Sequence, residues 1–135
     1  MNLEGGQEQQ AIAQLGIKKL NPMQVSSLEK SNERRDLVLL SPTGSGKTLA
    51  FLLPILRKLQ PETRGVQALI LVPSRELAIQ IESVFKKMTS AYKINACYGG
   101  HSMKTEINNL SNPPAVLVGT PGRVDDHLKR RTFNP

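Results

Sequence analysis

The sequence predicts an α/β domain with a largely parallel sheet and flanking helices. Two observations support this prediction. Short apolar runs alternate with segments of helical periodicity along almost the whole chain, and one glycine-rich turn joins a predicted strand to a predicted helix. At 135 residues the chain has the length of a single domain with one core.

Four short apolar runs have the character of strands that are buried on both faces. They span residues 37–40, 68–72, 94–98 and 115–119. Helical signals cover residues 48–59, 75–88 and 103–110, and residues 11–15 could close a short amphipathic helix. Gly, Pro and Asn clusters fall between these segments, as expected for the connecting turns.

The turn at residues 41–48, S-P-T-G-S-G-K-T, has the composition of a phosphate-binding loop. Small residues let successive backbone N–H groups point at a polyphosphate, and the following helix adds the positive end of its dipole. Lys47 would reach the β and γ phosphates, and Thr48 would ligate Mg²⁺, which makes both candidate catalytic residues. Ser41 stands where the general pattern has glycine. The candidate nucleotide-binding residues here are Thr43, Gly44, Ser45, Gly46, Lys47 and Thr48. The alternative is a solvated turn that caps a helix.

Charge and composition narrow the functional class. Lysine and arginine outnumber acidic residues by 18 to 11, and the net charge of +7 favours a polyanionic partner. No apolar stretch reaches membrane-spanning length, and the N-terminus lacks a signal-peptide pattern. Cys97 is the one cysteine, so we expect a cytoplasmic protein with an inert, buried thiol at this position.

Four further motifs accompany the loop in a distinctive order. They are G-I-K-K-L-N-P-M-Q at residues 16–24, P-S-R-E-L-A-I-Q at 73–80, Y-G-G at 98–100 and T-P-G-R at 120–123. In this order they resemble the Q motif, motif Ia, the GG motif and motif Ib of DEAD-box ATP-dependent RNA helicases. The resemblance covers residues from about 15 to 131, and it implies a P-loop NTPase fold of the RecA-like type.

The resemblance implies that Gln24 reads the adenine of ATP. An amide suits this role because it can donate and accept at once, as the N6/N7 face of adenine requires. The chain departs from the family pattern at Leu20 and Asn21, which replace Pro and Thr, and at Gln7, where the family has an aromatic that stacks on adenine. The alternative is that Gln24 is an exposed amide on the first turn of a helix.

The other motifs imply contacts with the RNA backbone. Arg75 would meet a phosphate at a helix N-terminus, and the glycine pair would admit a close sugar-phosphate chain. We expect these residues to share one sheet edge with the phosphate-binding loop, because all follow strand C-termini. The candidate RNA-binding residues are Pro73, Arg75, Gly99, Gly100, Thr120, Gly122 and Arg123. Without the neighbouring motifs, the alternatives are that Arg75 lies on a solvated helix turn and that the glycine pair lies in a plain loop.

The resemblance also implies a truncated domain. The 135 residues contain neither the D-E-A-D carboxylates nor the S-A-T motif of the family, nor a second RecA-like domain. We therefore interpret residues 1–135 as the N-terminal part of RecA-like domain 1 of an ATP-dependent RNA helicase. We expect this part to bind ATP weakly and to contact the RNA backbone, and we expect it not to hydrolyse ATP alone. Truncation would leave residues 37–40 short of strand neighbours, so self-association is expected.

Two alternatives remain open at this stage. One is a non-catalytic, nucleotide-gated RNA-binding module, and the other is a P-loop DNA helicase or translocase. His101 and His127 have no partners at metal-ligand spacing, so surface or loop roles are expected for both. Residues 125–127, D-D-H, are interpreted as the solvated face of a helix, and the basic residues 129–131 as a solvated terminus.

Overall fold

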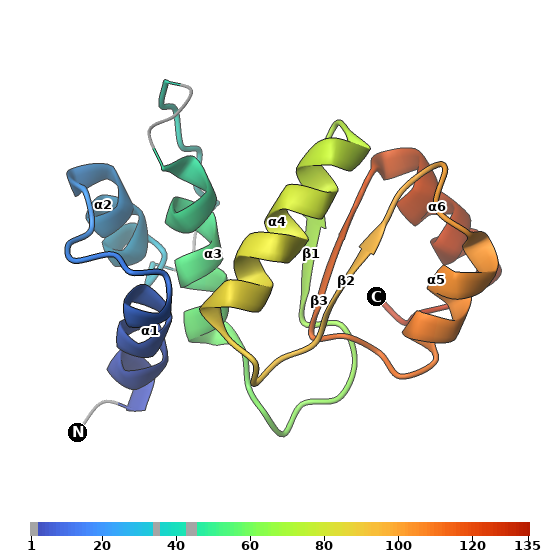
Figure 1. The fold of residues 1–135 in the computed structure, drawn as a ribbon, viewed down its shortest axis with the longest axis horizontal. Helices are drawn as coiled ribbons and strands as arrows, with labels where there is room; N and C mark the ends of the chain where they lie inside the picture. The colour runs from blue at the N-terminus through green and yellow to red at the C-terminus, as the bar shows by residue number, and fades with distance from the viewer. Residues whose placement is uncertain (1–2, 34–35, 43–45) are drawn as a thin grey trace. The chain divides into compact units, whose positions relative to one another are not determined.

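The computed structural model describes residues 3–33, 36–42 and 46–135, and the chain divides into two compact units (Figure 1). The first unit spans residues 1–59 and the second spans residues 60–135. Within the described residues, all regular structure of the first unit is helical, whereas the second unit contains the sheet. In the same residues, none of the helices combines the length and the apolar character needed to cross a membrane.

The first unit contains α1 (Leu3–Gln14), α2 (Pro22–Lys30) and α3 (Lys47–Lys58), and both α1 and α2 pack against α3. The Arg57 guanidinium on α3 joins the three helices. It donates hydrogen bonds to the Glu8 carboxylate on α1 and, over 3.2 Å, to the backbone oxygen of Leu28 on α2. A charged side chain thus fixes the helix arrangement at one end of the unit.

The second unit is built on three parallel strands, β1 (Ala68–Leu71), β2 (Ile94–Cys97) and β3 (Val116–Gly119). Their order in the sheet is β1-β3-β2, with Val116 of β3 in register with Ala68 and Ile94. All four residues of β3 are buried, as expected for the central strand of a parallel sheet. Because the strands are parallel, their carboxyl ends lie at one edge of the sheet.

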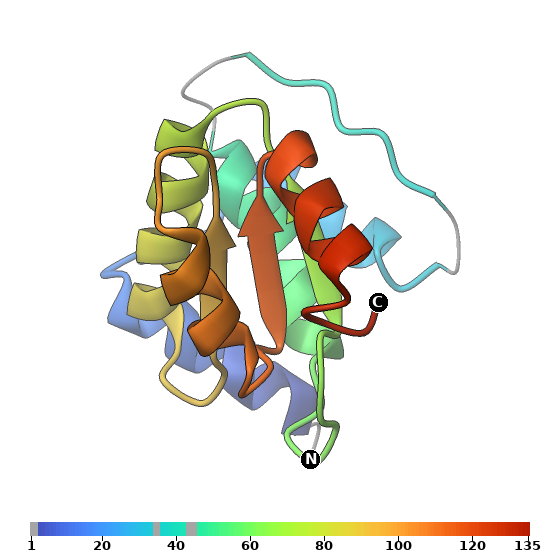
Figure 2. The same ribbon diagram turned by 90° about the vertical axis from the view of Figure 1, so that its right-hand side faces the viewer.

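Helices cover both faces of this sheet. Helix α4 (Arg75–Met88) lies on one face, and α5 (Met103–Leu110) and α6 (Pro121–Arg130) lie on the other (Figures 1 and 2). The core on the α5 and α6 side is an aliphatic and aromatic cluster. It is formed by Cys97, Leu110, Leu117, Val124 and Phe133. The α/β architecture predicted from the sequence is confirmed in this unit.

The fourth predicted strand, residues 37–40, is not a strand. The segment has no regular secondary structure and no ladder partner, and Val38 and Leu40 are 82% and 89% exposed. A strand is stable when its backbone groups pair and one face is buried, and this segment has neither. The apolar composition therefore predicted a strand that these residues do not form.

The other predicted elements match closely at their ends. Helices α4 and α5 have the predicted bounds, α3 is displaced by one residue, and each strand is shorter by one residue. Helix α1 begins at Leu3, well before the predicted start at residue 11, and the salt bridge between Glu8 and Arg57 anchors its polar part. Helix α2, which was not assigned, starts with an Asn21 N-cap and Pro22 in its first turn.

Candidate functional site

The phosphate-binding loop leads directly into α3. Thr43, Gly44 and Ser45, predicted to bind nucleotide, lie outside the described residues. Gly46 is the N-cap of α3 with φ 86°, and no side chain caps the helix. Lys47 is exposed and Thr48 half-buried in the first turn. The helix therefore offers the backbone N–H groups and cation that a phosphate group needs.

Gln24 is buried and lies against this loop, which excludes the alternative of an exposed amide. Its Nε2 donates to the backbone oxygen of Gly46 over 3.3 Å, and its Oε1 accepts from the backbone N–H of Asn21 over 2.9 Å. A Cβ on Gly46 would lie 2.6 Å from Nε2, and the positive φ also favours glycine there. The structure thus brings Gln24 and the phosphate-binding loop together.

A pocket of about 600 Å³ lies along α2 and the residues just before it. It includes Leu20 and Asn21, the two residues that depart from the family pattern. The pocket is lined by Lys19, Leu20, Asn21, Pro22, Val25, Ser26 and Glu29. None of these residues is aromatic, so a planar ligand would find no ring to stack on here.

The predicted RNA-binding residues lie at the carboxyl ends of the three strands. Pro73 and Arg75 follow β1, Gly99 and Gly100 follow β2, and the segment 120–123 follows β3. The shared sheet edge expected from the sequence is therefore present for these residues of the second unit. The phosphate-binding loop belongs to the first unit.

At this edge, Arg75 is the cation that motif Ia (residues 73–80) contributes, and its side chain is accessible to solvent. Its side chain is 61% exposed and pairs with the neighbouring Glu76 over 3.0 Å, a weak interaction in water. Arg75 also lies beside Gly100, where a Cβ would be 3.2 Å from Nη1 and where φ is 89°. Ser74 caps α4 by accepting from the N–H of Leu77. The first turn of α4 thus presents a cation next to the glycine pair.

Arg123 points into the second unit and is only 15% exposed. Its Nε donates to Glu106 Oε1 over 2.8 Å, and its Nη2 donates to the backbone oxygen of His101. The arginine of motif Ib was predicted to bind an RNA phosphate. In the structure its side chain is hydrogen-bonded to an internal carboxylate and to the loop after β2.

Glu106 is the centre of this network and was not identified from the sequence. Its side chain is fully buried and accepts four hydrogen bonds, two at each oxygen. Oε1 accepts from Arg123 and from His127 Nε2 at 2.7 Å, whereas Oε2 accepts from the Tyr98 N–H at 3.0 Å and from His101 Nδ1 at 2.9 Å. Because an ionised carboxylate only accepts, both imidazole nitrogens that face it carry hydrogen.

Burial by itself would raise the pKa of Glu106. The hydrogen bonds from His127, Arg123, the Tyr98 backbone and His101 outweigh this effect, so the pKa is lowered from its usual value of 4.5. Glu106 is therefore ionised at neutral pH, and its charge is balanced by the Arg123 guanidinium.

His127 is fully buried, which corrects the expectation that residues 125–127 form a solvated face. Asp125 and Asp126 are exposed as expected, but the imidazole lies between Glu106 and the Thr132 hydroxyl, 2.7 Å from Nδ1. His101 stacks on Tyr98 with ring centroids 4.9 Å apart. The sequence did contain a signal, because Glu106 and His127 follow Met103 and Val124 at a spacing of three on the apolar faces of their helices.

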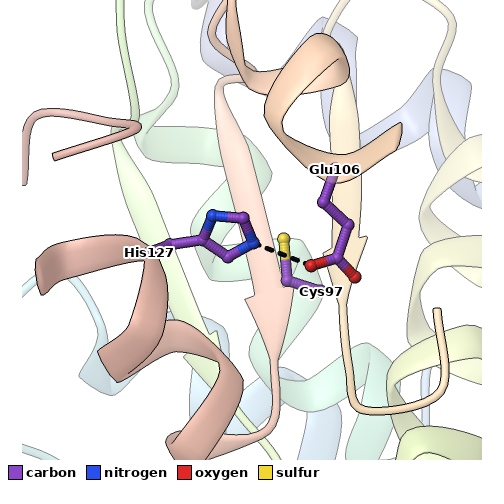
Figure 3. A group of neighbouring side chains, drawn as sticks. All are labelled: Cys97, Glu106 and His127. Atoms are coloured by element: carbon purple, nitrogen blue, oxygen red, sulfur yellow. Dashed lines mark hydrogen bonds and ion pairs between the residues drawn. The ribbon is translucent and has the colours of Figure 1, made fainter. Parts of the chain in front are cut away.

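Cys97, Glu106 and His127 form a compact group whose ligand atoms all lie within 4.8 Å of one another (Figure 3). Their chemistry does not suit a metal ion. Without a metal ion, burial, followed by the charge of Glu106, raises the pKa of Cys97 to about 12, so the sulfur is a thiol at neutral pH. Glu106 Oε1 already faces the Arg123 cation, which would repel a metal ion. The inert, buried thiol expected at position 97 fits this environment.

Comparison with known proteins decides the family. Residues 21–134 match the family model described as DEAD/DEAH box helicase. The chain belongs to this family. Over 128 residues, the chain is 40% identical to the ATP-dependent RNA helicase DeaD of Escherichia coli (strain K12). This match covers 93% of this chain and 20% of the relative. It is 36% identical to the DEAD-box ATP-dependent RNA helicase CshA of Bacillus subtilis (strain 168), covering 91% and 25%.

Solved structures agree with the helicase assignment and with a RecA-like fold. A hypothetical ATP-dependent RNA helicase from Sulfolobus tokodaii matches with a TM-score of 0.82 at 30% identity, over 98% of this chain and 38% of the other. The yeast DEAD-box splicing factor Prp28 matches with a TM-score of 0.80 at 33% identity, over 91% and 31%. The chain thus spans about a fifth to a quarter of the length of the curated relatives cited here and about a third of these structures.

Proposed function

We propose that this chain is the N-terminal part of the first RecA-like domain of an ATP-dependent RNA helicase, and that it binds ATP with Mg²⁺ and the RNA backbone. The contact between Gln24 and Gly46 carries the nucleotide part of this proposal. It places an amide with donor and acceptor atoms beside a helix N-terminus that no side chain caps. Adenine and phosphate recognition would then share one site.

The residues of the first unit suit Mg²⁺-ATP by their chemistry. Lys47 would neutralise the β and γ phosphates, and the Thr48 hydroxyl would ligate Mg²⁺, which screens phosphate charge when bound. Gln24 would bind adenine through its second N–H or by exchanging its bond to Gly46. Thr43, Gly44, Ser45 and Gly46 would supply backbone N–H groups around the phosphates.

RNA would bind along the edge formed by residues 73–75, 99–100 and 120–123. The exposed cation of Arg75 and the backbone N–H groups at the start of α4 and in the glycine pair suit phosphate oxygens. Thr120 is half-buried at the start of α6, where its hydroxyl and Gly122, two residues further on, can approach a phosphate. None of these groups reads base edges, so the binding would not depend on RNA sequence.

Binding of a fluorescent single-stranded RNA tests the RNA part. We expect a decauridylate and a mixed-sequence decamer to bind with equal affinity, and we expect log K to fall linearly with log[salt]. A strong preference for one sequence, or binding that salt does not weaken, would contradict backbone recognition.

We further propose that hydrolysis requires the D-E-A-D carboxylates, which these 135 residues do not contain. ATP turnover by the chain should therefore equal that of the Lys47→Ala variant, because oriented water and full Mg²⁺ coordination are missing. Turnover at the rate of a complete helicase, abolished by Lys47→Ala, would overturn this statement. A cytoplasmic location and self-association through apolar surface complete the proposal.

A further inference from the structure

In the second unit, the segments that follow β2 and β3 would contact RNA. A single buried carboxylate is hydrogen-bonded to both of them. Glu106, on α5, bonds the backbone N–H of Tyr98 and the His101 ring in the loop after β2. It also bonds Arg123 and His127 on α6, the helix that follows β3. The glycine pair lies between Tyr98 and His101, so both ends of that short loop are attached to Glu106.

Each of these bonds fixes a position because a buried charge tolerates no missing partner. The carboxylate is removed from water, and its four donors replace the lost hydration. Arg123 adds a second restraint, since its guanidinium holds the backbone oxygen of His101 while it faces Glu106. The loop and the start of α6 therefore cannot move independently without leaving a charge unpaired.

We propose that Glu106 is a positioning residue for RNA binding, and that Arg123 braces the loop at residues 98–101 instead of acting as a phosphate ligand. This inference rests on the proposed RNA-binding function. The contrast between the two arginines supports it. Arg75 is 61% exposed beside Gly100, whereas Arg123 is 15% exposed and its guanidinium bonds two internal acceptors.

The salt dependence of RNA binding separates the two roles. Arg75→Gln should reduce the slope of log K against log[salt] by about 0.7, the value for one lost phosphate contact on a single strand. Arg123→Gln should leave the slope unchanged and weaken decauridylate binding by the same factor at every salt concentration. Arg123→Lys should also weaken binding, because a lysine keeps the charge but cannot bond Glu106 and His101 together.

A slope that falls equally in Arg123→Gln and Arg75→Gln would overturn the brace. So would full RNA affinity in Arg123→Lys, because a phosphate ligand needs only the charge. Circular dichroism at each salt concentration confirms that the variants are folded. If Arg123→Gln does not fold, Arg123→Lys and the Glu106 variant below decide the question.

Glu106→Gln tests the carboxylate itself, because it keeps the shape and removes the charge. The matched control is Glu82→Gln, since Glu82 Oε2 accepts from the backbone N–H of Ala96 on β2 at 2.9 Å but touches neither RNA-facing segment. We expect Glu106→Gln to weaken decauridylate binding roughly ten-fold, the effect of losing one hydrogen bond to a charged group, and Glu82→Gln to leave it unchanged.

Amide hydrogen exchange provides a readout that does not need RNA. In Glu106→Gln the Tyr98 amide should exchange roughly ten-fold faster, while the Val118 amide in the centre of the sheet keeps its protection. Arg123→Gln should also speed exchange in the loop. An unchanged Tyr98 amide in Glu106→Gln would overturn the positioning role. If the wild-type chain shows no salt-dependent RNA binding, the proposed function fails, and the exchange rates still decide whether Glu106 holds the loop.

Discussion

The Glu106 side chain shows how one ionised group can be more stable inside a domain than its burial suggests. Burial opposes ionisation, but His127, Arg123, Tyr98 and His101 supply hydrogen bonds that outweigh the burial effect and lower the pKa below 4.5. A group whose pKa is lower in the folded state stabilises that state above its unfolded pKa. The contribution is lost as pH falls through the folded pKa.

Replacing Glu106 should therefore have a pH-dependent cost. At pH 7 we expect Glu106→Gln to lower the free energy of unfolding by roughly 2 to 4 kcal/mol, because Arg123 and His127 lose an ionised partner. As pH falls below the usual pKa of 4.5, the difference from wild type should shrink, since the unfolded chain takes up a proton first and the native protein loses the same charge once pH passes the lower folded pKa. Urea unfolding at pH 7 and pH 4 measures both values.

Tyrosine fluorescence is a suitable signal for this experiment. The two tyrosines, Tyr92 and Tyr98, both lie in the second unit, and the chain has no tryptophan. The signal therefore reports on the unit that contains Glu106, and Glu82→Gln controls for the loss of a carboxylate elsewhere in the same unit, on α4. A difference between Glu106→Gln and wild type that does not change with pH would contradict the pKa argument.

Single residues differ in how far the sequence reveals them. Gln24, Lys47, Thr48 and Arg75 belong to local motifs, so their neighbours in the sequence were enough to propose them as site residues. Glu106 gains its role from partners on α6 and in the loop after β2, which are distant along the chain. A charged residue on an apolar helix face is a weak signal, and its meaning becomes clear only when the partners are known.

At the scale of elements, local signals set the ends of α4. Ser74 precedes the helix with extended backbone, and its Oγ accepts from the N–H of Leu77 at 3.2 Å. The N-cap and the apolar stripe are both readable from the sequence, which explains why the predicted bounds of α4 are correct.

Removing this cap should have a measurable cost. Ser74→Ala leaves a helix N–H without its side-chain acceptor, so we expect the free energy of unfolding to fall by about 1 kcal/mol. Ser74→Thr keeps a hydroxyl at the same place and should lose much less. Urea unfolding of both variants decides the matter, and equal stability of Ser74→Ala and wild type would show that the bond contributes nothing.

The segment at residues 37–40 shows where local signals are insufficient. Its composition favours a strand, yet strand formation depends on a neighbour that donates and accepts hydrogen bonds. The three strands of the described sheet pair with one another, and residues 37–40 pair with none of them. Pairing partners are a property of the whole chain, so composition alone could not decide this element.

At the scale of the whole molecule, apolar surface remains in contact with solvent. Val38 and Leu40 lie in the segment at residues 37–40, and Leu69 and Leu71 lie on β1, which is an edge strand of the three-stranded sheet. Exposed apolar side chains and strand edges both favour association. We propose that copies of this chain cover these surfaces mutually.

Sedimentation velocity across micromolar concentrations tests this proposal. The wild-type chain should sediment as a concentration-dependent mixture, and Leu40→Lys should shift it toward monomer. Leu128→Lys is the matched control, because Leu128 is an exposed leucine that lies on α6 and not on a strand or in the segment 37–40. A monodisperse wild-type monomer at all concentrations would contradict self-association.

The central claim for the whole chain is that it binds an adenine nucleotide. Calorimetric titration with Mg-ADP and Mg-GDP is the most direct test of this claim. If Gln24 and the loop before α3 form one adenine nucleotide site, Mg-ADP should bind, Mg-GDP should bind at least roughly ten-fold more weakly, and Lys47→Ala should abolish the heat of Mg-ADP binding. Equal affinity for both nucleotides would contradict adenine recognition by Gln24. Undiminished binding in Lys47→Ala would contradict the phosphate site itself.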